Sequence, residues 1–204
     1  MGRTSDAKVK LLDVAFHSIW NNSYGGVSVD QICEQAGVNK GSFYYYFSSK
    51  AELAMAACDE HWKQKQPEMD RIFSAQTPPL DRLINWCDYV YRRQKEKAGL
   101  YGHVCGCPYG SIGVELATQD DKIRAKANEM IERGTKYLEG AIAEAQREGS
   151  LPPGPAKRLA QQAYAYVMGA ILRAKISNDV EVLRDLAPTV LAIIGARSGA
   201  ALAA

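Results

Sequence analysis

Side chains that can hydrogen-bond to a polyanion gather in one short stretch, residues 40–46. It carries an ammonium, a hydroxyl and two phenols at positions that a helix would turn outward: Lys40, Ser42, Tyr44 and Tyr45. Phe43 and Phe47, four residues apart, give the same helix a buried side. Phenols and ammonium groups reach DNA phosphates and hydroxyls reach base edges, so the stretch suits the major groove. The alternative is an ordinary helical hairpin with a polar outer face, because two packed helices alone specify no ligand.

Thiols supply a second possible chemistry, at Cys33, Cys58, Cys87, Cys105 and Cys107. No two have the CxxC spacing of metal ligands, and an odd number of cysteines without an export signal argues against a disulfide framework. Cys107 directly precedes Pro108, which suits the first turn of a helix, so the helix dipole is expected to lower the thiol pKa and favour the reactive thiolate. A buried core residue is the alternative for Cys107, and it is the preferred interpretation of Cys33, Cys58 and Cys87.

Two short helices around a tight turn must hold the polar stretch in place. Ser28 is a good N-cap for the first of them, and Gly37 is expected to end it in the left-handed conformation. Asn39 can then cap the second helix. A longer helix is predicted before them, from about Thr4 or Ser5 to Asn22, with one apolar stripe formed by Leu12, Ala15, Phe16 and Ile19.

The rest of the chain has helical periodicity and no strand pattern, so we predict an all-α fold of about nine helices. A capping box at residues 49–52 starts the fourth helix, and Pro67 is expected to kink or end it near Gln66. The last two helices, about 156–176 and 180–196, are apolar on more than one face, which indicates contact with a second chain. Pro188 is expected to kink or split the second. The predicted interface residues are Leu159, Ala163, Tyr166, Val167, Leu186, Val190, Ile193 and Ile194.

Composition is that of an ordinary globular protein. The 204 residues are 47% hydrophobic and 24% charged, with a net charge of +2. Bulk charge does not indicate nucleic-acid binding, so affinity for DNA would come from a few well-placed cations and from dimerisation. No apolar run approaches the roughly 20 residues that span a bilayer, and no signal-peptide pattern opens the sequence, so a cytoplasmic location is expected.

Residues 28–53 resemble the DNA-binding domain of the TetR family of helix–turn–helix transcriptional regulators, and residues 36–47 agree with the family pattern at nearly every position. The resemblance implies a DNA-binding domain at 1–50 and a helical effector-binding and dimerisation domain at 51–197. Residues 198–204 are expected to be a disordered tail. The resemblance also implies a homodimer on double-stranded operator DNA, with repression preferred and activation as the alternative. No cofactor is expected, and the lack of a CxxC pair or His-rich cluster argues against a structural metal. The implied DNA-binding residues are Ser28, Val29, Asn39, Lys40, Gly41, Ser42, Tyr44, Tyr45 and Lys50.

Two further segments, 106–116 and 169–177, resemble the NemR-like subgroup, which responds to electrophiles and reactive chlorine. That resemblance implies sensing by Cys107 and Lys175. This chain differs in having Cys105 before the sensing position and Pro-Tyr-Gly-Ser after it. The effector is therefore expected to be a small molecule or a reactive species. The candidate effector and redox residues are Cys107, Lys175, Cys105, Trp62, Trp86, Tyr89, Tyr164 and Met168, although aromatic residues at helical spacing usually belong to a core.

Two other classes of function compete with a regulator. One is a thiol-dependent enzyme with Cys107 as nucleophile, and the other is a partner-binding module without an operator. The enzyme is disfavoured because His61 and His103 have no known catalytic spacing from Cys107. Salt-dependent binding to the DNA upstream of the chain's own gene would distinguish a regulator from both.

Overall fold

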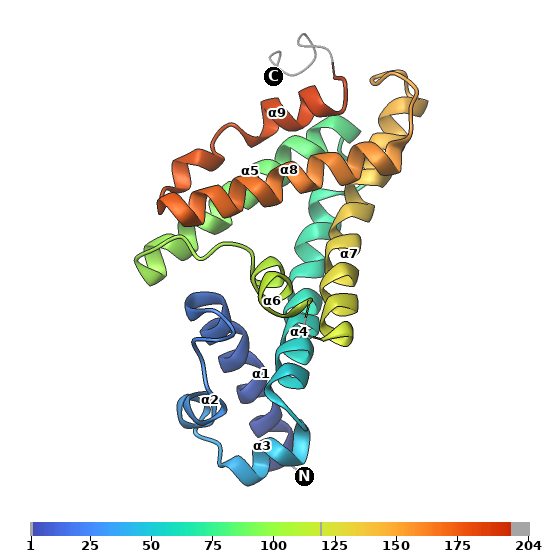
Figure 1. Cartoon of the computed structure of the whole chain (residues 1–204). Helices are drawn as coiled ribbons and strands as arrows, with labels where there is room; N and C mark the ends of the chain where they lie inside the picture. The colour runs from blue at the N-terminus through green and yellow to red at the C-terminus, as the bar shows by residue number, and fades with distance from the viewer. Residues whose placement is uncertain (1, 119, 197–204) are drawn as a thin grey trace. The chain divides into compact units, whose positions relative to one another are not determined.

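The computed structural model describes residues 2–118 and 120–196, and over these residues it is built of helices without a strand (Figure 1). The α-helices are α1 Gly2–Asn22, α2 Val29–Ala36, α3 Lys40–Tyr46, α4 Lys50–Ile72, α5 Pro79–Tyr101, α6 Pro108–Leu116, α7 Asp121–Arg147, α8 Ala156–Ser177 and α9 Leu186–Ile193, with a 3-10 helix η1 at Val180–Leu183. The predicted all-α class is confirmed. The predicted tail, 198–204, lies outside the described residues.

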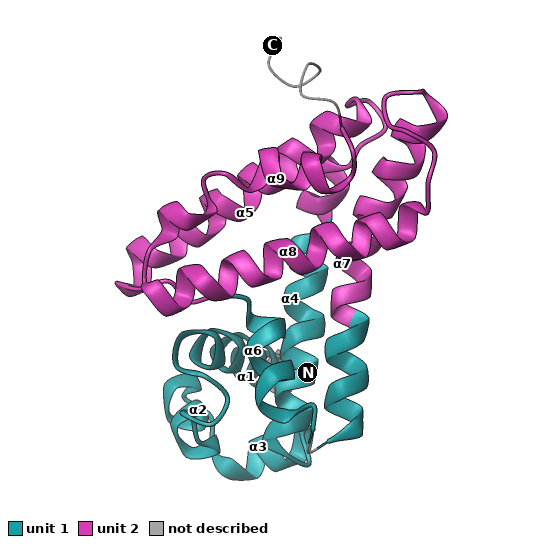
Figure 2. Ribbon diagram, turned by 45° about the horizontal axis from the view of Figure 1, so that its top comes forward, with its two compact units in different colours: residues 1–66, 107–129 teal, residues 67–106, 130–204 magenta. Residues whose placement is uncertain are grey.

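The chain forms two compact units (Figure 2). Unit 1 comprises residues 1–66 and 107–129, and unit 2 comprises residues 67–106 and 130–204. Unit 1 therefore holds α1 to α3, most of α4, and α6, which contacts α1. A division into compact units does not show which residues carry which function, so the predicted boundary between a DNA-binding domain and an effector domain after residue 50 stays a prediction.

Proline does not end the fourth helix. α4 runs through Pro67 to Ile72, so of the two predicted outcomes the end near Gln66 is wrong and the kink stays a prediction, while the boundary between the compact units falls between Gln66 and Pro67. Residues on both sides of Pro67 are buried, among them Trp62 and Met69, and their packing favours the helix despite the missing N–H donor. Pro188 behaves as expected, because the span 180–196 is divided into η1 and α9.

Caps at both ends define the turn between α2 and α3. The Ser28 hydroxyl accepts from the Gln31 N–H at 3.2 Å, and the Gln31 side-chain oxygen accepts from the Ser28 N–H at 2.8 Å. Gly37 ends α2 with φ +63°, and the Asn39 side chain caps α3 by accepting from the Ser42 N–H at 2.7 Å. The three predicted caps are therefore confirmed.

Unit 1 buries one apolar core under these helices. α1 contacts both α2 and α3 and contributes Leu11, Ala15, Phe16 and Ile19. Phe43 and Phe47 of the α3 region are buried against this core, as the four-residue spacing predicted. α3 is thereby fixed by its apolar side, and its polar side is left to solvent.

Unit 2 contains a partly buried ion pair that the sequence analysis did not predict. The Arg82 guanidinium donates to both Glu144 carboxylate oxygens, at 2.7 and 2.9 Å, and to the Thr77 carbonyl at 2.6 Å. Arg82 is only 4% exposed, and bidentate pairing of this kind compensates the cost of removing its charge from water. The pair joins α5 to α7.

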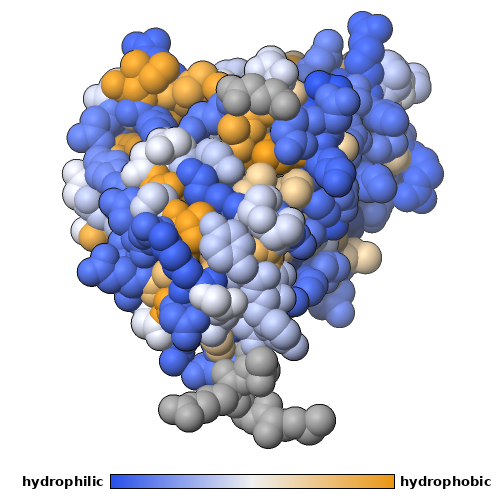
Figure 3. Space-filling model, turned by 60° about the horizontal axis from the view of Figure 1, so that its bottom comes forward, coloured by the Kyte–Doolittle hydropathy of each residue, from blue (hydrophilic) through white to orange (hydrophobic). Residues whose placement is uncertain are grey.

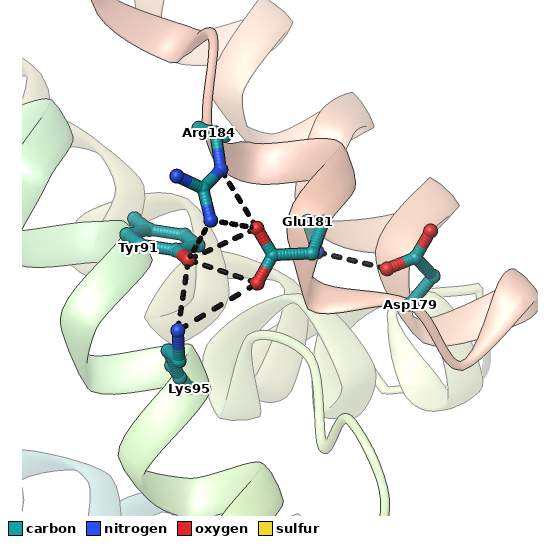
Figure 4. A network of polar contacts seen from close by, with 5 residues as sticks. All are labelled: Tyr91, Lys95, Asp179, Glu181 and Arg184. Carbon is teal, nitrogen blue, oxygen red and sulfur yellow. Dashed lines mark hydrogen bonds and ion pairs between the residues drawn. The ribbon is translucent and has the colours of Figure 1, made fainter.

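A polar network holds η1 against α5 (Figure 4). The Tyr91 hydroxyl donates to the Glu181 carboxylate at 2.9 Å, Lys95 lies 3.7 Å from that carboxylate, and Arg184 donates to it from the next turn. Hydrogen bonds from Arg184 and Tyr91 hold the pKa of Glu181 below its ordinary value. Leu183, beneath the network, is fully buried.

Replacing Gly37 by alanine should destabilise the protein through backbone strain alone. No atom lies within 4 Å of a Cβ at this position, so the cost is that of φ +63° for an L-residue, about 1–2 kcal/mol. The matched control is Gly140→Ala, which also has open space around its Cβ but lies inside α7, and which should stabilise by about 1 kcal/mol. Chemical denaturation measures both, and equal effects of the two variants would contradict this view of the turn.

Candidate nucleic-acid interface and sensor region

Two phenols form the most exposed part of α3. Tyr44 and Tyr45 are 60% and 76% exposed, unusual values for aromatic side chains in a capped helix whose other face is buried. Gly41 is also exposed, and its Cβ-free surface lets a ligand backbone approach the start of the helix. The arrangement presents hydrogen-bonding groups outward on a fixed base, as a groove-reading helix requires.

Lys40 is already paired within the chain. Its ammonium lies 2.6 Å from a carboxylate oxygen of Asp30 on α2, and this bond raises the pKa of Lys40. Both side chains are largely exposed, so the pair is weak in water and can be exchanged. A DNA phosphate would have to replace Asp30 for Lys40 to act as predicted.

Lys50 does not stand free to hold a phosphate. Its ammonium donates to the backbone carbonyls of Tyr24 and Val27, at 2.8 and 2.7 Å, and lies 3.9 Å from the centre of the Tyr24 ring. Burial lowers the pKa of Lys50. The structure therefore places this residue inside unit 1 as a support for the loop between α1 and α2. This contact joins residues far apart in the sequence, so sequence analysis did not predict it.

The remaining predicted DNA-binding residues lie beside α3 or at helix caps. Ser28 and Asn39 use their side-chain oxygens in the caps described above. Val29 and Ser42 are half-buried. Of the predicted DNA-binding residues, the most exposed side chains are thus those on the outer face of α3.

Cys107 is the N-cap residue of α6, as predicted, but its thiol is not acidified. Burial raises the pKa of Cys107, and this effect exceeds the lowering by the N–H groups of Gly110 and Tyr109 and by the charge of Lys65. The expectation of a lowered pKa was wrong because the helix dipole acts here on a thiol withdrawn from water. Burial also raises the pKa of Cys58 and of Cys87 to about 12.

Lys175 lies against the segment that leads into α6. A Cβ on Gly106 would come within 2.8 Å of the Lys175 Cδ, so the lysine stem packs directly on this glycine, whose φ is +84°. The charges of Lys175 and Lys97 lower the pKa of the Cys105 thiol, but burial outweighs them and the pKa is raised. Within unit 2, the thiol whose pKa the charges of Lys175 and Lys97 lower is thus that of Cys105.

Two buried polar residues near this segment were not predicted. Lys97 is 8% exposed, with its ammonium 5.9 Å from the centre of the Tyr101 ring. Gln94 is 6% exposed and donates to the Gly106 carbonyl at 3.1 Å, while its side-chain oxygen has no hydrogen-bond partner. The only sign of their burial in the sequence was their position on an otherwise apolar stripe of α5.

The predicted effector-cavity aromatics belong mainly to packed surfaces. Trp86 is buried and stacks on Tyr164 with ring centres 5.8 Å apart, and Tyr164 lies directly over Gly134. Tyr89 and Met168 are half-buried, and Trp62 is buried in unit 1. A cavity of about 240 Å³ in unit 2 has none of these side chains in its wall, which is formed by Arg71, Ile72, Thr77, Asn85, Asp88 and Arg92.

Most of the predicted dimer-interface residues are covered by their own chain. Ala163, Val167, Leu186, Val190 and Ile194 are buried, which corrects the prediction, since a partner chain cannot contact them. Leu159, Tyr166 and Ile193 are half-buried. They were predicted because helical periodicity marks apolar faces without telling the face toward the core from the face toward a partner.

None of the described helices is long and apolar enough to cross a bilayer. Within residues 2–118 and 120–196, no three His, Cys, Asp or Glu side chains gather in a way that could hold a metal ion.

Two family models match the chain. The one described as bacterial regulatory proteins, tetR family, matches residues 11–57, and the one described as tetracyclin repressor-like, C-terminal domain, matches residues 79–190.

Curated relatives match along most of their length. The chain is 30% identical to the transcriptional regulator AcuR of Cereibacter sphaeroides over 90% of this chain and 83% of that protein. It is 32% identical to the HTH-type transcriptional repressor DhaR of a Mycobacterium species over 78% of each. The crystal structure of reduced NemR from Escherichia coli superposes with a TM-score of 0.79 at 25% identity, covering 95% of this chain and 99% of that one.

Alkylation of Cys107 should report its raised pKa. Because the thiolate reacts and burial disfavours it, the iodoacetamide rate should rise about tenfold per pH unit from pH 7 to 9, without levelling near the ordinary value of about 8.5. Mass spectrometry assigns the site, with Cys107→Ser as control, and the deeply buried Cys58 and Cys87 should stay unmodified in the folded protein. A rate that levels off below pH 8 would show an acidified thiol instead.

Proposed function

The chain belongs to the tetR family of bacterial regulatory proteins and is a TetR-like helix–turn–helix transcriptional regulator, and from this premise we propose that it represses transcription as a homodimer bound to operator DNA. Each subunit would place its α3 in the major groove, with the two helices in successive grooves about one helical turn apart. TetR regulators bind operator DNA and function as dimers, and DhaR and NemR are named repressors.

The single observation that carries the proposal is the exposed phenol pair of α3. Tyr44 and Tyr45 protrude from a helix of seven residues whose caps and buried Phe43 fix its orientation. Phenol hydroxyls hydrogen-bond to phosphates and base edges, and their rings exclude water at little conformational cost. Most of the surface of both phenols is therefore available to a ligand.

Dimerisation is proposed through the outer face of α8. Ala165, Gly169, Leu172 and Ile176 recur at spacings of four, three and four residues and are all exposed. The two small residues permit close approach of helices, and the two aliphatic ones, 55% and 75% exposed, would be buried by a partner. Hydrophobic residues interrupt the hydrophilic surface at several separate places in Figure 3, so exposure alone does not mark the interface. Support for the proposal comes from the position of these four exposed residues along one side of α8.

The effector is proposed to act on residues 104–107, the segment before α6. Support comes from its surroundings in unit 2, where Lys97, Lys175 and the unpaired oxygen of Gln94 lie near this segment. A small molecule bound there, or an electrophile or oxidant that modifies the half-buried Cys107, would favour a conformation that no longer fits the operator. Operator DNA lies in the bacterial cytoplasm, so the proposal places the protein there, with no catalytic activity of its own.

Tyr45→Ala should weaken operator binding about tenfold while the protein stays folded, since the side chain is 76% exposed. Lys40→Ala should flatten the slope of log affinity against log salt by about one unit. The probe is the DNA upstream of the chain's own gene, with binding followed by fluorescence anisotropy. The control is Leu100→Ala, which removes an equally exposed apolar side chain of unit 2. Unchanged binding by both α3 variants would rule out this helix as the reading element.

Leu172→Glu should shift the protein from dimer to monomer, because it introduces a carboxylate into the proposed interface without disturbing a buried residue. Operator affinity should fall together with the dimer, since the two α3 helices act in concert. Sedimentation velocity gives the oligomeric state, and Leu100→Glu serves as the matched control. A variant that remains dimeric at micromolar concentration would place the interface elsewhere.

A further inference from the structure

We propose that Glu115 of α6 is a positioning residue for operator binding: it holds the loop between α1 and α2 in the conformation from which α2 and α3 are built. The inference rests on the proposed function only for its consequence on DNA, because the contact itself lies within unit 1.

The Glu115 carboxylate receives two backbone hydrogen bonds from this loop. One oxygen accepts from the Tyr24 N–H at 3.1 Å, and the other accepts from the Gly25 N–H at 2.8 Å. Glu115 is half-buried. Hydrogen bonds to an ionised acceptor are about twice as strong as neutral ones, and two parallel bonds also fix direction. The carboxylate thus accepts backbone N–H groups of a loop, residues 23–27, that has no helix or strand to satisfy them.

The loop needs such support from outside. It contains Gly25 and Gly26 in succession, which lose much conformational entropy when they are ordered. Ser23 adopts φ +87°, a backbone conformation that residues other than glycine rarely adopt. A Cβ on Gly26 would lie 2.7 Å from the Asn22 carbonyl oxygen, so this residue cannot be stiffened by substitution. The loop conformation is therefore costly and depends on its tertiary contacts.

Lys50 binds the carbonyl groups of the same loop, whereas Glu115 binds its N–H groups. Its ammonium donates to the Tyr24 and Val27 carbonyls, while Glu115 accepts from the Tyr24 and Gly25 N–H groups. The charge of Glu115 also acts on Lys50 and opposes the lowering of its pKa by burial. A cation at the start of α4 and an anion in α6 thus hold the peptide groups of one loop between them.

A second contact fixes the other end of α6. The Tyr109 hydroxyl lies 2.7 Å from Nδ1 of His61 on α4, and the His61 ring stacks on Phe16 of α1 with ring centres 3.8 Å apart. α6 is consequently tied to α1 near its first turn and to the α1–α2 loop near its last. A displacement of α6 would pull on the loop that leads into Ser28, the N-cap of α2.

The test compares Glu115→Gln with Glu139→Gln, a half-buried glutamate of unit 2, as the matched control. Loss of the carboxylate charge should speed amide hydrogen exchange at Tyr24 and Gly25 about tenfold or more. Operator affinity, measured on the DNA upstream of the gene, should fall about tenfold with an unchanged salt slope, because Glu115 neutralises no phosphate. Unchanged exchange at both amides would overturn the proposed contact, and faster exchange with unchanged affinity would overturn its role in DNA binding.

A double-mutant cycle separates positioning from a general loss of stability. If Glu115 and Lys50 act through the same loop, the Glu115→Gln, Lys50→Gln double variant should lose clearly less affinity than the product of the two single losses. Strictly independent effects would contradict the proposal. Should Glu115→Gln fail to fold, Glu115→Asp keeps the charge with a shorter reach and should show the same pattern to a smaller degree. If wild-type protein does not bind the DNA, the proposed function fails, while the exchange experiment still decides whether Glu115 orders the loop.

Discussion

The fold depends on one constraint: a helix of seven residues cannot keep its shape in water by itself. Isolated helices shorter than about 12–15 residues are marginal, and α3 spans only Lys40–Tyr46. Asn39 therefore caps its start, and Phe43 and Phe47 anchor its inner side in the core that α1 provides. α2, itself only eight residues, is closed by the Ser28 capping box and by Gly37. The exposed phenols have a fixed direction because the cap and the buried Phe43 hold the opposite side of α3.

The same constraint explains why α2 and α3 are also held by contacts from α4 and α6. Lys50 and Glu115 hold the loop before α2, and His61 links Tyr109 to Phe16. These contacts place α6 in the same compact unit as the helix–turn–helix. An element that is needed to hold the loop is also an element whose movement can release it, and α6 begins directly after the segment that carries Cys105 and Cys107. We propose that a chemical event at Cys107 would reach α3 through α6 and the loop before α2.

Local signals predicted a large part of this arrangement. The caps at Ser28, Gly37 and Asn39, the buried pair Phe43 and Phe47, and the N-cap position of Cys107 depend on neighbours within four residues, and all are found as expected. Features that depend on distant residues were missed or misjudged. Lys50 turned inward to carbonyls 23 and 26 residues away, Arg82 found Glu144, and burial overcame the helix dipole at Cys107. Periodicity likewise marked Val190 and Leu186 as apolar but could not tell the core from a partner surface.

The central claim is that two copies of this chain present their α3 helices to one face of a DNA duplex. Hydroxyl-radical footprinting on the DNA upstream of the gene tests it most directly. The account predicts two protected patches per strand, separated by about one helical turn, or 10–10.5 base pairs, and lying on the same face of the duplex. Both patches should disappear together when the protein is diluted below its dimerisation constant. A single protected patch that persists under dilution, or protection with no helical phase, would contradict the claim.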